Sequence, residues 1–69
     1  MFNSLMLEIA ITRSQISKRD LAKKLGISEQ RLYNKLNGIS EFKASEIRAL
    51  SDELSLSSQE REEIFFAKG

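Results

Sequence analysis

The side chains with the most directed hydrogen-bonding chemistry lie close together in residues 28–37, which read SEQRLYNKLN. The amides of Gln30 and Asn34 can each form two hydrogen bonds with adenine in the major groove of DNA, and Arg31 can do the same with guanine. Glu29 can accept a hydrogen bond from a cytosine amino group, or disfavour wrong sequences through its charge. This set of polar groups predicts a surface that reads DNA bases.

A helix over about 28–36 would point Gln30 and Asn34 outward together, with Arg31 on one flank and Tyr33 on the other. At about 100° per residue, Leu32 and Leu36 mark the inward face, and Gln30 and Asn34 then point outward. A recognition helix enters the major groove with its N-terminal turns. The predicted base-reading residues on this helix are Glu29, Gln30, Arg31 and Asn34. The alternative interpretation is that they are ordinary solvated positions of an amphipathic helix.

Groups suited to DNA phosphates surround this helix. Ser17 and Lys18 open the preceding helix, where free N–H groups and the positive end of the helix dipole attract anions. The Tyr33 hydroxyl can reach a phosphate, or the ring can simply pack over the helix edge. The predicted phosphate contacts are Ser17, Lys18, Ser28, Tyr33, Lys35, Asn37 and Lys43. For the lysines, the alternative is an ordinary solvated surface.

Two short helices joined by a tight turn must position these residues. Ser17 is an N-cap residue, and Gly26 ends its helix because glycine adopts the left-handed conformation without steric cost. Ser28 caps the next helix, so the turn from Gly26 to Ser28 predicts a helix-turn-helix over about 17–37. The residues expected to support this motif from the core are Leu21, Ala22, Leu25, Ile27 and Leu32.

The rest of the chain also has helical spacing, and its β-branched residues do not alternate. Helices are expected over about 3–13, 18–25, 29–36, 44–54 and 57–66. The apolar residues expected to bury one face of the first helix are Phe2, Leu5, Met6, Ile9 and Ala10, widened by Leu7 and Ile11. The sequence therefore predicts an all-α fold of five short helices.

Composition favours one small domain, residues 1–69, without catalytic activity. The absence of Cys and His removes the usual zinc ligands, the thiol nucleophile and the usual general base. We therefore expect no enzyme, no cofactor, no metal and no small-molecule substrate. No apolar run approaches the roughly 18 residues of a membrane span, and the N-terminus lacks the basic region of a signal peptide. A soluble, cytoplasmic protein that does not enter membranes is expected.

The net charge of +1 hides a marked asymmetry along the chain. Residues 1–12 carry −1, residues 13–43 carry +5 and residues 44–69 carry −3. The positive segment includes the proposed reading helix and its neighbours. This segregation favours a surface that faces a polyanion, although helix surfaces also carry Lys and Glu without such a role.

The segment ISKRDLAKKLGISEQRLYNKLNG resembles the core motif of the Cro- and repressor-type, lambda-repressor-like helix-turn-helix regulators of temperate bacteriophages. The segment that follows is similar to small regulators from phages of Gram-positive bacteria. The resemblance implies a five-helix domain that binds double-stranded operator DNA, usually as a homodimer, in a lysis–lysogeny switch inside the bacterial host cell.

The same resemblance assigns roles to individual residues. It implies that Glu29, Gln30 and Asn34 read bases, that Lys18 and Asn37 hold phosphates, and that Ser40 in the following loop reaches a base edge. The chain departs from the family pattern at two positions. Lys35 stands where many members have an apolar residue. Lys43 stands where the helix over about 44–54 commonly has a Ser or Thr cap, and the lysine weakens that helix end by roughly 1 kcal/mol.

A second function of a different class is a modulator, or antirepressor, that binds a companion phage repressor. Phe65 and Phe66 are adjacent, so they cannot both face one core stripe, and one is expected to be partly exposed. Both are candidate protein contacts, although the alternative is that both pack under the terminal helix. The acidic residues nearby would suit a basic partner, and they are Glu60, Glu62 and Glu63.

Overall fold

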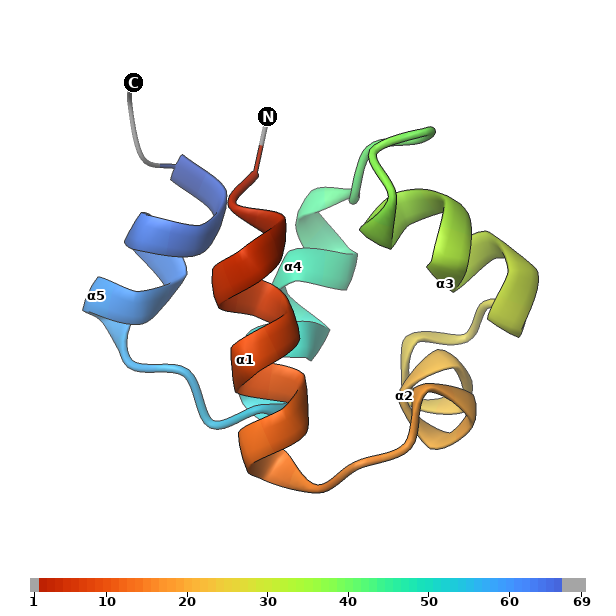
Figure 1. Ribbon diagram of the computed structural model, residues 1–69, viewed down its shortest axis with the longest axis horizontal. Helices are drawn as coiled ribbons and strands as arrows, with labels where there is room; N and C mark the ends of the chain where they lie inside the picture. The colour runs from red at the N-terminus through yellow and green to blue at the C-terminus, as the bar shows by residue number, and fades with distance from the viewer. Residues whose placement is uncertain (1, 67–69) are drawn as a thin grey trace.

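The computed structural model describes residues 2–66, which form short helices joined by turns and loops (Figure 1). In chain order these are α1 (Ser4–Ser14), α2 (Lys18–Leu25), α3 (Glu29–Leu36), α4 (Ala44–Glu53), α5 (Ser58–Arg61) and η1, a turn of π-helix (Glu62–Phe66). No strand occurs within residues 2–66, so the all-α, five-helix prediction is confirmed. Lys68, which was counted in the charge of the last segment, lies outside the described residues.

Four helices begin at a polar residue that caps the first turn. In each case a side-chain oxygen accepts a hydrogen bond of 3.0–3.1 Å from the backbone N–H three positions later. The four capping residues are Asn3, Ser17, Ser28 and Ser57. α4 differs, because a lysine side chain cannot accept a hydrogen bond. Its first turn is closed instead by the Glu46 carboxylate, which accepts the Lys43 N–H at 2.7 Å.

One apolar core holds the helices together. Its four fully buried side chains are Leu7, Leu21, Leu32 and Leu50, one from each of α1 to α4. α2 packs against both α3 and α4, and α1 packs against η1. Burial of these leucines contributes on the order of 1.5–3 kcal/mol each. The core therefore fixes the angle between α2 and α3, which is the geometry of the helix-turn-helix.

The expected buried face of α1 is wrong in part. Leu5 and Ile9 are 69% and 57% exposed, whereas Leu7, Ala10 and Ile11 are buried. On a helix, positions 7, 10 and 11 cluster on one side, and positions 5 and 9 fall on the opposite side. Because apolar residues surround α1 on nearly all sides, the spacing alone could not identify its buried face.

An aromatic cluster connects the beginning and the end of the described chain. The rings of Phe2, Phe42 and Phe65 pack with centroid distances of 5.4, 5.9 and 6.2 Å. The Asn3 N–H also donates to the Ile64 carbonyl at 2.6 Å. These contacts hold η1 against the start of α1, and they bring the loop before α4 into the same cluster.

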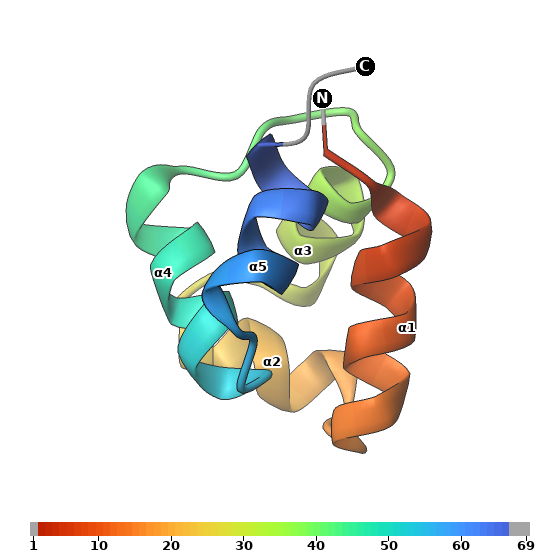
Figure 2. The same ribbon diagram turned by 90° about the vertical axis from the view of Figure 1, so that its left-hand side faces the viewer.

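Different helices lie at the two ends of the molecule. α2 and α3 lie at one end of the longest axis in Figure 1, and α5 lies at the other. Figure 2, viewed from the α5 end, agrees with this arrangement, because α5 is in front and α2 and α3 are behind. The molecule measures 29 × 24 × 20 Å. None of the helices in residues 2–66 combines the length and apolar character that crossing a bilayer requires.

Candidate nucleic-acid interface

The predicted helix-turn-helix is present in α2, α3 and the turn between them. The turn begins at Gly26, whose φ of +73° lies in the left-handed region. Nothing lies within 4 Å of the place where a Cβ would sit, so the backbone conformation alone favours glycine here. The Ile27 N–H donates to the Ala22 carbonyl at 3.0 Å and closes the end of α2. Leu32 of α3 is buried in the core and anchors the second helix.

α3 presents its polar residues to solvent. Glu29, Gln30 and Arg31 are exposed, and Asn34 is half-buried. The Gln30 Nε2 donates to the Asn34 Oδ1 at 3.1 Å, so the two amides form one hydrogen-bonded pair one helical turn apart. This bond leaves the Gln30 carbonyl oxygen and the Asn34 amide N–H groups for other partners. Gln30 and Asn34 thus share one accessible ridge of α3, and Glu29 and Arg31 are exposed on its two flanks in the first turn.

The fifth base-reading candidate lies on the loop that follows α3. Gly38 has a φ of +78° and turns the chain back along the helix. The Ile39 and Ser40 N–H groups both approach the Asn34 carbonyl, at 2.8 and 3.4 Å. Ser40 is exposed, and the loop that carries it is hydrogen-bonded to the end of α3.

Lys18 lies between α1 and α3. Its ammonium contacts the Glu8 carboxylate at 3.2 Å and sits 5.4 Å from the centroid of the Tyr33 ring. A cation above an aromatic face is attracted to the ring quadrupole. Lys18 is thus held in place at the N-terminus of α2, where an anion would also meet the free N–H groups of the helix.

Most of the other phosphate candidates are also at the surface. The exposed ones are Ser17, Ser28, Tyr33, Asn37 and Lys43. The hydroxyls of both serines accept cap hydrogen bonds, and each can still donate its own proton. These residues flank α3 at the N-termini of α2 and α3 and along the loop to α4.

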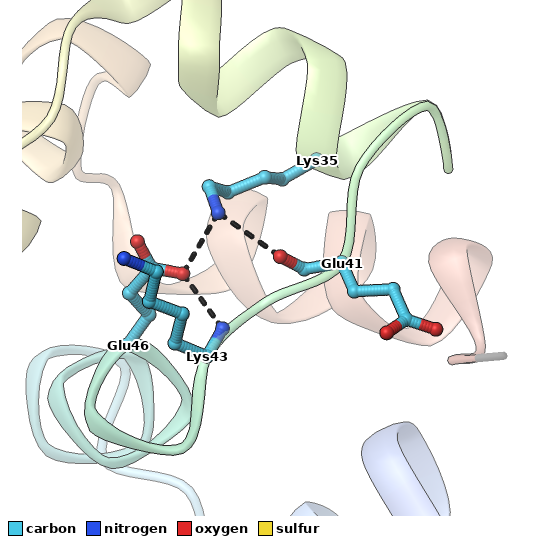
Figure 3. Close-up of polar contacts among 4 residues, drawn as sticks. All are labelled: Lys35, Glu41, Lys43 and Glu46. Atoms are coloured by element: carbon cyan, nitrogen blue, oxygen red, sulfur yellow. Dashed lines mark hydrogen bonds and ion pairs between the residues drawn. The ribbon is translucent and has the colours of Figure 1, made fainter.

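The prediction for Lys35 is wrong in this structure. Lys35 is only 4% exposed, and its ammonium donates to the Glu46 carboxylate at 2.9 Å and to the Glu41 carbonyl at 3.0 Å (Figure 3). The reason is helical spacing, because Lys35 follows Leu32 by three positions and so lies on the buried side of α3. Its charge is satisfied inside the molecule and does not face a phosphate.

The Glu46 carboxyl is charged despite its burial. Burial alone raises the pKa of Glu46, but the hydrogen bond from the Lys43 N–H and the neighbouring Lys35 ammonium outweigh this effect. The pKa of Glu46 therefore lies below its ordinary value of 4.5. Every buried side-chain nitrogen and oxygen within residues 2–66 has a hydrogen-bond partner.

The two candidate protein-contact residues have different surroundings. Phe65 packs into the aromatic cluster, whereas Phe66 is 52% exposed. As expected, one of the two adjacent rings is accessible. It lies on η1, which continues from α5 at the end of the molecule away from α3 (Figure 1).

The sequence alone did not identify the groups that bind Lys18 and Lys35. Glu8 pairs with Lys18, and Glu46 and the Glu41 carbonyl receive Lys35. Only one of these had a local signal, because an acidic residue at the third position of α4 is typical of a capped helix start. The other pairings join residues from different elements and depend on the tertiary fold.

The described residues offer no obvious place for a metal. Within residues 2–66, no three His, Cys, Asp or Glu side chains come together in a way that could hold a metal ion.

An open groove of about 570 Å³ lies beside the loop between α3 and α4, and its lining includes Leu36, Gly38, Phe42 and Phe65.

Comparison with known families agrees with this arrangement. The family model for the Cro/C1-type HTH DNA-binding domain matches residues 6–60, which is most of the chain and includes the whole helix-turn-helix. The chain therefore belongs to the family of Cro/C1-type HTH DNA-binding domains. Searches of curated proteins and of solved structures found no significant match.

Proposed function

We propose that this DNA-binding chain is an operator-specific transcriptional regulator whose α3 enters the major groove. The observation that carries the proposal is the exposed Gln30–Asn34 pair on a helix anchored from beneath by Leu32. Amide groups of this kind match the donor and acceptor pattern of adenine. The proposed base contacts are Glu29, Gln30, Arg31, Asn34 and Ser40.

The phosphate contacts follow from the exposed groups around α3. Lys18 at the start of α2 and Lys43 before α4 supply positive charge on two sides of the helix. Polar side chains complete the proposed set with Ser17, Ser28, Tyr33 and Asn37. Phosphate contacts of this type fix the register of the protein on DNA, while the base contacts provide specificity.

A homodimer on DNA is part of the proposal. A single reading head of this size makes few contacts, whereas half-sites of two-fold operators lie about 34 Å apart. By its resemblance to phage regulators, we assign the chain to a lysis–lysogeny switch in the cytoplasm of a bacterial host, with no cofactor.

Selection of bound DNA from a random pool tests the proposal. The expected result is one enriched sequence with two-fold symmetry. Its affinity should fall with salt at a log–log slope of about −0.9 for each phosphate contacted. A pool without any enriched sequence would contradict operator binding.

The second candidate function is a modulator that binds a companion phage repressor. The exposed Phe66, beside the exposed Glu62 and Glu63, favours it, because this surface would suit a basic and partly apolar partner. Such a chain would show no stable DNA complex alone, and it would form a defined complex with the purified repressor. A Phe66→Ala variant would weaken that complex without changing the fold.

A further inference from the structure

The Lys35–Glu46 ion pair is an unusual feature of so small a core. Lys35 is 4% exposed and Glu46 is 7% exposed. Removing two charges from water is costly, and well-packed apolar residues often stabilise a fold equally well or better. Folding stability alone is therefore a weak explanation for placing this pair between α3 and α4.

The pair is bonded to the backbone of the loop as well as to itself. The Lys35 ammonium donates to the Glu41 carbonyl at 3.0 Å, and the Glu46 Oε1 that receives Lys35 also accepts the Lys43 N–H at 2.7 Å (Figure 3). Residues 41 and 43 are both in the loop that follows α3. One side chain from α3 and one from α4 thus hold the backbone at the far end of this loop, on either side of Phe42, whose ring packs in the aromatic cluster.

The near end of the loop is fixed separately. The Asn34 carbonyl accepts the Ile39 N–H at 2.8 Å, directly after the left-handed Gly38. The intervening residues have no helix or strand of their own. The Ser40 N–H also approaches the Asn34 carbonyl, at 3.4 Å, so the exposed Ser40 side chain is placed by this attachment to α3 on one side and by the ion pair on the other.

We propose that Lys35 and Glu46 are positioning residues for DNA reading, and that they hold the loop so that Ser40 approaches a base while α3 occupies the groove. This inference rests on the proposed operator binding. Neither residue touches DNA, because both are buried. Their effect passes through the Glu41 carbonyl and the Lys43 N–H to the loop.

Two matched double variants separate the two attachments. The variant Lys35→Met with Glu46→Leu removes both hydrogen bonds to the loop backbone. The variant Lys35→Met with Glu46→Gln removes the bond to the Glu41 carbonyl but keeps an acceptor for the Lys43 N–H. Both avoid leaving an unpaired buried charge. We expect amide exchange at residue 43 to accelerate only in the Met/Leu variant, and the backbone order of residues 39–42 to fall in both.

The DNA measurement uses the operator selected by the wild-type chain, with unrelated DNA as the control. Both variants should lose about tenfold in operator affinity, the size of one lost base contact, and keep their affinity for unrelated DNA. Ser40→Ala should weaken operator binding in the wild-type chain and have no further effect in the Met/Leu variant. If the ion pair only stabilised the fold, the affinities for operator DNA and for unrelated DNA would fall together.

Several results would overturn the inference. Unchanged loop order, unchanged operator preference or an additive effect of Ser40→Ala would each do so. Loss of cooperative unfolding in both variants would show that the pair is needed for the fold itself. If the wild-type chain selects no DNA sequence, the proposed function fails, and loop order alone then decides whether the pair positions the loop.

Discussion

The hydrogen bond between Gln30 and Asn34 makes the two amides a single unit at the residue scale. Each restricts the rotamers of the other, so less side-chain entropy remains to be lost when DNA binds. In the proposed base reading, a contact by one residue would therefore depend on the presence of the other. The pair has a directed geometry that two independent side chains would lack.

We expect Gln30→Ala to weaken operator binding by about 1–3 kcal/mol, as loss of a bidentate base contact does. Asn34→Ala should have a similar effect, and the double variant should lose less than the sum because the residues are in contact. Titration with operator DNA measures the affinity of the two single variants and of the double variant. Gln59→Ala is the matched control, because Gln59 makes the same type of bond, to Glu63, on α5. Equal losses in the control would contradict the assignment of Gln30.

In the proposed complex, the Glu8 carboxylate would compete with a DNA phosphate for Lys18. A phosphate that binds Lys18 would either share the ammonium with this carboxylate, 3.2 Å away, and be repelled by it, or displace it, so we expect Glu8→Gln to strengthen binding to any DNA. Exposed ion pairs contribute about 0–1 kcal/mol, which limits the gain to roughly fivefold. Fluorescence titration with unrelated DNA measures it. Glu53→Gln, an exposed change on α4, controls for net charge, and an equal gain there would exclude a specific effect at Lys18.

At the scale of the elements, the helix ends were predictable because their signals are local. Ser17, Ser28 and Ser57 cap helices, and Gly26 ends one, through contacts within four residues. Helix faces were predictable where apolar residues occupied one side, as on α3. On α1, where apolar residues cover more than one face, the prediction was wrong for Leu5 and Ile9.

Lys35 shows what local patterns could not provide. Its place on the buried side of α3 follows from its spacing to Leu32. The groups that satisfy its buried charge are Glu46, eleven positions away, and a backbone carbonyl of the loop, and no local pattern indicates them. The outward direction of Gln30 and Asn34 was nonetheless predictable, because the inward direction of Leu32 fixes it.

The turn between α2 and α3 gives a prediction for Gly26. Its φ of +73° costs a residue with a Cβ roughly 1–2 kcal/mol, and nothing nearby would clash with that Cβ. Gly26→Ala should lower the free energy of unfolding by this amount, and Gly26→Asn by less, since Asn tolerates the left-handed region. Urea denaturation measures both. Equal losses for Ala and Asn would show that the backbone conformation is not the cause.

At the scale of the whole molecule, two carboxylates link stability to pH. The pKa of Glu46 is lowered, since the Lys43 N–H and Lys35 outweigh burial. The pKa of Glu60 is lowered by the Ser57 N–H and then by Arg13, whose guanidinium lies 3.0 Å away. In the unfolded chain both carboxyls bind protons at a higher pH than in the folded chain.

Acid should therefore destabilise the fold. The stabilisation from Glu46 and Glu60 is fully present above their ordinary pKa of 4.5 and is lost as the pH falls through their lower folded values. Thermal unfolding between pH 7 and pH 3 measures this dependence. Glu60→Gln should make it shallower, and Lys35→Met with Glu46→Gln should do so as well. A pH dependence identical to the wild type in both variants would exclude these carboxylates as its source.

The backbone hydrogen bond between Asn3 and Ile64 makes the described chain almost a closed ring. A circular permutant could join the two ends through a short linker and begin instead at the exposed Ser55, in the turn between α4 and α5. All the helix contacts would survive this reordering. Such a permutant would separate the role of chain connectivity from the role of packing in presenting the reading helix.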